Sequence, residues 1–200
     1  MIHFTDATGL LGCALAIVVI ASRALGALRV PPVHLRWGLA AIFIGVLVPL
    51  GGLPLAGYVR GATGDLSVAS LVLLAAALLG SLRGWPAPSG RSQLLLLIVI
   101  AAAGFYPLAL GWGDYDPYRL GYGSPWFLAY LLGLALLSAM KGFPVIAFTI
   151  ALSVLAWSAG WCESTNLWDY LLDPLVSAYA AAAIITQGIR KIRAARAIKP

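Results

Sequence analysis

Long apolar stretches separated by short polar connections are the feature that most constrains the fold of this chain. Hydrophobic residues make up 62% of its 200 residues and charged residues only 10%, whereas soluble domains are about 25% charged. A helix of about 20 apolar residues crosses the ~30 Å hydrocarbon layer of a bilayer. The sequence therefore predicts an all-α, polytopic transmembrane helix bundle that forms one integral-membrane domain over residues 1–200. About seven spans are expected, near residues 7–28, 37–58, 66–82, 93–112, 125–140, 144–161 and 167–188.

Charged residues sort to opposite sides when the chain is threaded through these spans. All the carboxylates fall on one side. Of the 13 Lys and Arg residues, eleven fall on the other side, and the exceptions are Arg60 and Arg119. Cytoplasmic connections near span ends collect Lys and Arg. We therefore expect the N-terminus outside, the C-terminus in the cytoplasm, and a location in a bacterial cytoplasmic (inner) membrane. The carboxylates of the outer face are Asp6, Asp65, Asp114, Asp116, Glu163, Asp169 and Asp173.

The net charge of +6 does not indicate nucleic-acid binding, because the positive surplus is concentrated in a tail at residues 189–200. Basic residues directly after a span fix topology and meet anionic lipid headgroups. We expect membrane lipids as partners, a protein partner docked through the outer loops, and no nucleic acid. The basic residues of the tail are Arg190, Lys191, Arg193, Arg196 and Lys199.

The second span contains a run of helix-breaking residues. Pro49, Gly51, Gly52 and Pro54 fall within six positions. Proline removes a backbone donor, and bare backbone at membrane depth survives only where protein or water satisfies it. One interpretation is a discontinuous helix of the kind found at transporter binding sites, and the other is a proline kink packed against neighbouring helices.

Two starts compete for the last helix. Asn166 with Asp169 three residues later resembles a capping box, and a helix that begins there would place Asp173 roughly 9 Å inside it, as a functional carboxylate. Alternatively, Asp173 caps a helix whose first residue is Pro174, and residues 167–172 form a short interfacial helix. Residues before proline avoid the α region, which favours the second start.

The outer loops hold the candidates for a metal site. Asp114 and Asp116 could both bind one divalent cation such as Mg²⁺ or Ca²⁺, with Glu163 or Asp169 completing an oxygen shell from the neighbouring loop. The alternative is that both are turn-forming aspartates, with Asp116 starting a short helical turn. No cofactor is expected beyond this divalent cation.

Two further pairs of residues belong to the same outer face. Arg60 and Arg119 are its only cations, and each could pair with the acids or bind a lipid phosphate. Cys13 and Cys162 also fall there, where an oxidising compartment would allow a disulfide, although two separate apolar thiols are the simpler account of them. Asp65 is expected to cap the third span.

Three classes of function are compatible with these features. We favour a non-enzymatic accessory or binding component with an acidic and aromatic outer face, because the chain has no G-x-S-x-G, H-E-x-x-H or phosphate-binding glycine motif. The second class is a small-solute or lipid transporter that uses the broken second span and Asp173. The third is a metal-dependent enzyme that acts on a lipid-linked substrate at the outer face.

Overall fold

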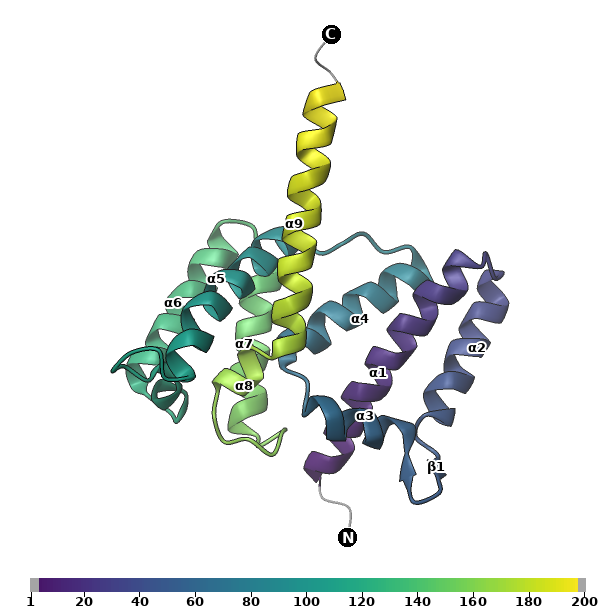
Figure 1. Cartoon of the computed structure of the whole chain (residues 1–200), viewed down its shortest axis with the longest axis horizontal. Coiled ribbons are helices and arrows are strands. Elements are labelled where there is room, and N and C mark those ends of the chain that lie inside the picture. The colour runs from purple at the N-terminus through teal and green to yellow at the C-terminus, as the bar shows by residue number, and fades with distance from the viewer. Residues whose placement is uncertain (1–3, 198–200) are drawn as a thin grey trace.

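The computed structural model describes residues 4–197, and the regular structure in this part of the chain consists of helices and one short hairpin (Figure 1). The all-α prediction is therefore confirmed. Residues 198–200 of the predicted tail, with Lys199, lie outside the described residues. The elements are α1 Phe4–Ala27, α2 Pro32–Gly45, β1 Pro49–Leu50, β2 Leu53–Pro54, α3 Leu55–Thr63, α4 Val68–Arg83, α5 Arg91–Ala109, the 3-10 helix η1 Pro117–Gly121, α6 Pro125–Met140, α7 Pro144–Ser158, α8 Trp168–Leu171 and α9 Pro174–Ala197.

Helices α1 to α4 form one half of the molecule, in which α1 packs against α2, α3 and α4 (Figure 1). Cys13 and Ala14 of α1 are fully buried and lie in one apolar cluster with Ala56 of α3. Val18, one helical turn further along α1, packs against Leu39 of α2. These apolar contacts fix α1 as the centre of this half.

The chain leaves the helical conformation between α2 and α3. α2 ends at Gly45, and β1 pairs with β2 so that Pro49 lies opposite Pro54. Gly51 and Gly52 have φ angles of 71° and 122°, which glycine adopts without the steric penalty that other residues meet. The predicted span at 37–58 is thus two short helices joined by a hairpin, because proline and glycine interrupt the helical hydrogen bonds here.

Helices α5 to α9 form the other half. α5 packs along α9, while α6 and α7 form an antiparallel pair (Figure 1). The tight turn between α6 and α7 contains Gly142 at a φ of 76°. Leu95, Tyr170 and Ala180 are fully buried in the core of this half. α4 contacts both α1 and α7 and so connects the two halves.

The last helix begins at the second of its two predicted starts. α8 is one short turn, Leu172 is extended, with φ −137° and ψ 143°, and α9 begins at Pro174. The helix therefore starts later than the predicted boundary at residue 167, and it continues past 188 to Ala197. The proline explains the start, since it disfavours helical geometry in the residue before it.

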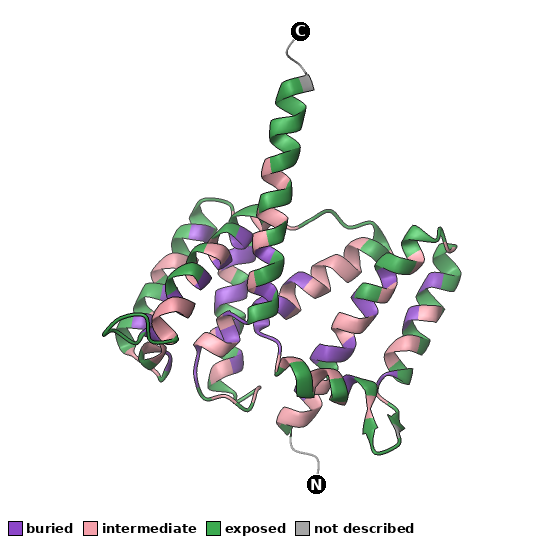
Figure 2. Cartoon of the chain, viewed as in Figure 1, coloured by how far each residue is buried: buried purple, intermediate pink, exposed green. Residues whose placement is uncertain are grey.

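Many large apolar side chains are exposed, and exposed residues occur along helices of both halves (Figure 2). Within residues 4–197, α1 and α5 are the helices long and apolar enough to cross a membrane, while α4, α6 and α7 are apolar but have 16, 16 and 15 residues. The apolar windows of α1 and α5 are 33% and 28% buried. Their length and composition give weak support for membrane association, and their exposed apolar faces add to it.

Candidate functional site at the acidic end

The two ends of the helices carry opposite charge. The start of α1, the hairpin, α8 and the start of α9 lie at one end, and the C-terminal part of α9 lies at the other (Figure 1). The first end holds the seven carboxylates of the chain with Arg60 and Arg119, which gives it a formal charge of −5. We call it the acidic end. The connections from α1 to α2, α4 to α5 and α6 to α7 lie at the opposite, basic end.

Arg60 of α3 is the centre of an ion-pair cluster at the acidic end. Its guanidinium contacts Asp65 at 2.6 Å, Asp6 of α1 at 3.1 Å and Glu163 of the α7–α8 loop at 2.8 Å. The hydrogen bond to Asp65 is the main reason that the pKa of Arg60 lies above its ordinary value. One cation against three carboxylates leaves this Arg60 cluster with a formal charge of −2, and it ties both halves of the molecule together.

Gly9 of α1 allows the Arg60 cluster to form. A Cβ atom at this position would collide with the guanidinium of Arg60 and the carboxylate of Asp65. The arginine side chain therefore lies directly on the backbone of α1, where only glycine leaves room for it. Asp65 is committed to this pair, and the cap of α4 predicted for it is instead Ser67, whose hydroxyl accepts from the N–H of Ser70.

Asp173 is 6% exposed, and its carboxylate accepts four hydrogen bonds. One carboxylate oxygen accepts from the Val176 N–H at 2.8 Å, so Asp173 caps α9. The other accepts from the Ser67 N–H at 2.9 Å, the Ser67 hydroxyl at 2.7 Å and the Ser70 hydroxyl at 2.5 Å. Asp173 therefore joins the N-termini of α4 and α9, where helix dipoles stabilise a negative charge.

Asp169 lies in a second polar cluster, between η1 and the α7–α8 loop. It accepts hydrogen bonds from the Tyr118 hydroxyl at 2.8 Å and the Ser164 hydroxyl at 2.5 Å. Burial, together with the bond to Asp169, raises the pKa of Tyr118 to about 12. Gly121 is required here because a Cβ would collide with the side-chain oxygen of Asn166, which accepts from the Trp168 N–H.

The predicted metal ligands do not converge. Asp116 caps η1 by accepting from the Tyr118 N–H at 2.9 Å, which is the turn-forming alternative. The Asp114 and Arg119 side chains make no hydrogen bond or ion pair with other described residues. Across residues 4–197, no three His, Cys, Asp or Glu side chains are placed to hold a metal ion. The divalent-cation site at Asp114 and Asp116 stays a prediction.

Two cavities open at the acidic end on either side of the Arg60 cluster. One, of about 760 Å³, is lined by Asp65, Asp116, Glu163, Asp169 and Asp173 together with the aromatic rings of Phe105, Tyr106 and Tyr118. The other, of about 720 Å³, is lined by Arg60, Asp6 and the break residues Pro49, Gly52 and Pro54. Asp65 and Glu163 line both cavities. The first, which we call the acidic cavity, has no Lys or Arg among its lining residues.

The aromatic residues of the acidic end fall into two groups. Trp168 is an internal one: its ring lies between Phe105 and Phe127, with centroids 4.5 and 4.6 Å away, and its indole N–H donates to the Pro117 carbonyl. Tyr170 is also internal and fully buried, whereas a second group is exposed, including Trp112 at 78% and Trp126 at 85%. The exposed group is Tyr58, Trp112, Tyr115, Tyr122 and Trp126.

Both cysteines are free thiols in this structure. Cys13 is buried in α1, and Cys162 is partly buried in the α7–α8 loop. Burial raises the pKa of Cys162 to about 12, so its thiolate is scarce at neutral pH. The disulfide between them is absent, and the interpretation as two separate thiols agrees with the structure.

Sequence reasoning missed the residues that hold the candidate site together. Ser67 and Ser70, which bind Asp173, are more than a hundred positions away from it in the chain. Gly9 carried no local signal, because its role depends on the approach of Arg60 from α3.

The comparisons with protein families, curated proteins and solved structures found no match for this chain.

Proposed function

We propose that this chain is a multi-pass protein of a bacterial cytoplasmic membrane, with the acidic end outside and the basic end in the cytoplasm. We further propose that it is a non-enzymatic binding component, whose acidic end docks a basic segment of a protein partner. The observation that carries this proposal is the segregation of charge: the seven carboxylates with Arg60 and Arg119 give one end of the helices a formal charge of −5. The connection after α5 at this end also contains exposed aromatic residues, Trp112 and Tyr115.

Exposed apolar side chains support the membrane location. They occur along helices of both halves, and soluble monomers rarely leave patches of this extent open to water. Seven spans would use α1, the α2–α3 pair, α4, α5, α6, α7 and α9. Helices of 15 or 16 residues are about 23 Å long, so the bilayer would thin slightly around α4, α6 and α7. Exposed examples are Ile20, Ile44, Leu96, Ile100, Leu132, Leu136, Phe148 and Leu155.

The partners of the carboxylates support binding over catalysis. Asp173 and Asp116 cap helices, Asp169 is held by Tyr118, and the remaining acids except Asp114 surround Arg60. These groups are fixed by structural contacts and supply a negative field. A field of one sign across a cavity attracts ligands of opposite charge and raises their association rate.

The acidic cavity indicates what the partner presents. Carboxylates and aromatic faces both attract cations, and Arg side chains bind either group. A Lys or Arg side chain of the partner fits a cavity whose lining combines Asp169 with Tyr118 and has no cation of its own. Exposed rings such as Trp112 and Trp126 would supply the apolar contact area that anchors most protein interfaces.

A transporter is the second candidate, because the broken second span lines its own cavity of about 720 Å³. Asp173 would then be expected to move a proton or bind the solute, although its four hydrogen bonds match a structural cap. A D173N variant that folds and retains full solute or lipid flux would remove this role. The third candidate is a metal-dependent enzyme. It would be excluded if Asp114 and Asp116 could both be replaced by asparagine without loss of a metal-dependent activity.

The binding proposal is tested by purification in mild detergent followed by native mass spectrometry. We expect a stoichiometric protein partner that dissociates as salt is raised, since the attraction is electrostatic. Trp112→Ala and Trp126→Ala should weaken the association at least tenfold. Trp85→Ala is the matched control, because Trp85 is an exposed tryptophan at the basic end. A partner that binds equally to all three variants would contradict the proposal.

A further inference from the structure

The C-terminal part of α9 extends beyond the other helices at the basic end (Figure 1). Among the described residues, its last side-chain hydrogen bond to another helix is the one from the Ser92 hydroxyl of α5 to Gln187. Every residue from 189 to 196 is exposed, and this segment is still helical (Figure 2). We call residues 189–196 the arm. It is open to contact from all sides.

The arm carries a positive charge that nothing in the described chain compensates. Four of its eight residues are cations and none is acidic. Their side chains make no hydrogen bond or ion pair with other described residues. Other cations of the basic end have internal contacts, since Arg36 donates to the Leu82 carbonyl and Arg83 lies over the Trp85 ring. The four arm cations are Arg190, Lys191, Arg193 and Arg196.

The length of α9 places these cations at the cytoplasmic headgroup layer of a membrane. α9 begins beside the start of α4, because Asp173 accepts from backbone N–H groups at both helix starts. A hydrocarbon depth of ~30 Å covers about 20 helical residues, and a layer thinned to about 23 Å covers about 15. Counted from Pro174, the hydrocarbon ends between about residues 189 and 194. Arg and Lys side chains near this boundary extend to the lipid phosphates.

Exposed isoleucines accompany the cations. Ile185, Ile189 and Ile192 lie on one face of α9, because residues three and four apart are neighbours on a helix. That face continues to Arg196, four residues after Ile192. A helix that lies flat on a membrane keeps its cations off the apolar face. A helix that crosses the leaflet upright meets acyl chains first and phosphates next, and the arm has this order of residues.

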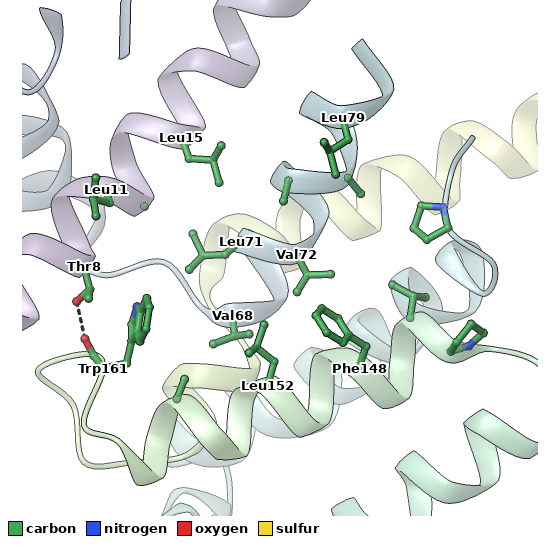
Figure 3. Close-up of a pocket in the computed structure, with 17 residues that line it drawn as sticks. Thr8, Leu11, Leu15, Val68, Leu71, Val72, Leu79, Phe148, Leu152 and Trp161 are labelled. Atoms are coloured by element: carbon green, nitrogen blue, oxygen red, sulfur yellow. Dashed lines mark hydrogen bonds between the residues drawn. The ribbon is translucent and has the colours of Figure 1, made fainter. Parts of the chain in front are cut away.

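The largest apolar opening of the molecule provides no alternative site for a headgroup. It is a groove of about 750 Å³ with α4 as its floor and α1 and α7 as its walls (Figure 3). The hydrogen bond from the Thr8 hydroxyl to the Trp161 carbonyl lies at its acidic end (Figure 3). No charged side chain of the described residues lines it, so the groove cannot distinguish lipids by headgroup charge. Such selection falls to the arm.

We propose that the arm of α9 binds anionic phospholipids of the cytoplasmic leaflet, with its four cations on the phosphate groups and its isoleucines against the acyl chains. This inference rests on the membrane location proposed above and does not depend on the protein partner at the acidic end. Each Lys or Arg near an anionic leaflet strengthens the attraction about fivefold. A phosphatidylglycerol headgroup has a net negative charge and a phosphatidylethanolamine headgroup has none, so the arm selects phosphatidylglycerol.

The test is native mass spectrometry of the full chain in mild detergent, after exchange with equal amounts of phosphatidylglycerol and phosphatidylethanolamine. We expect the retained lipid to favour phosphatidylglycerol by about fivefold or more. Replacement of the four arm cations by glutamine should remove most of this preference, and Arg193→Gln with Arg196→Gln should remove part of it. The matched control replaces four exposed cations of the basic end outside the arm and should keep the preference. The control residues are Arg23, Arg29, Arg36 and Lys141.

Equal loss of the preference in the arm variant and the control would overturn the proposal, because the whole basic end would then select the lipid. An acidic protein or a nucleic acid that is retained in place of lipid and is lost from the arm variant would also overturn it. Size-exclusion chromatography and thermal melting establish that each variant is folded. Recovery of the unchanged chain in the soluble fraction without detergent would refute the membrane location, whereas a membrane-bound chain without the lipid preference would refute the arm proposal alone.

Discussion

Replacement of Asp173 by alanine should be one of the most destabilising single changes in this protein. The carboxylate is buried and accepts hydrogen bonds from two backbone N–H groups, of Ser67 and Val176, and from two serine hydroxyls. The hydroxyls can rotate toward other acceptors, but the N–H groups at the starts of α4 and α9 cannot. Each buried donor left without an acceptor costs about 1–3 kcal/mol.

Two such donors give an expected loss of about 4 kcal/mol in the free energy of unfolding for Asp173→Ala. Asp173→Asn keeps one oxygen, which can serve one of the two helix starts, so we expect about half that loss. The measurement is equilibrium unfolding in mixed micelles, followed by circular dichroism. Asp114→Ala is the control, because Asp114 makes no hydrogen bond with other described residues and should change stability by less than about 0.5 kcal/mol.

A loss below about 0.5 kcal/mol for Asp173→Ala would refute this account of the contact between α4 and α9. The pairwise contribution is isolated by a double-mutant cycle with Ser70→Ala. If the two side chains interact as the 2.5 Å contact indicates, the double variant should be less destabilised than the sum of the single variants.

Other predictions address the rest of the acidic end. Arg60→Ala should lower the free energy of unfolding by about 2 kcal/mol, because it leaves the half-buried Asp65 without its cation. Glu163→Gln should lower it by less than about 0.5 kcal/mol in the same assay, because the Glu163 side chain is 65% exposed. Gly9→Ala should lower the melting temperature because its Cβ collides with Arg60, whereas Gly133→Ala, which meets open space in α6, should maintain or raise it. Alkylation of Cys162 at pH 8 should be roughly a thousandfold slower than that of an unperturbed thiol, since its pKa is about 12 instead of 9.0, and it should become fast in denaturant.

The helices were largely predictable from local signals. Ser124 with Pro125, Lys141 with Gly142 and Pro144, and Asp173 with Pro174 each mark an element boundary that the structure has at the same place, because proline and glycine restrict the backbone locally. The interruption of the second span also follows from its own residues, Pro49 to Pro54. Helix length was less predictable, as α9 shows by its extension to Ala197.

The contacts of the candidate site were not predictable, because they join distant segments. The sequence identifies Arg60 and the acids as one outer-face set, but the choice of Asp6, Asp65 and Glu163 as its partners depends on how α3 packs on α1. Similarly, the sequence predicts Trp168 to be an interfacial aromatic residue, yet its ring packs against the apolar core between Phe105 and Phe127. Pairing of this kind follows from tertiary packing.

Sidedness of cysteine labelling is the most direct test of the central claim, that the chain crosses a membrane with its acidic end outside. In a background where Cys13 and Cys162 are replaced by serine, Asp114→Cys reports on the acidic end and Lys141→Cys on the basic end. With a membrane-impermeant maleimide on intact spheroplasts, we expect labelling at position 114, and at position 141 only after permeabilisation. Labelling of both positions in intact cells, or of position 141 alone, would contradict the proposed topology.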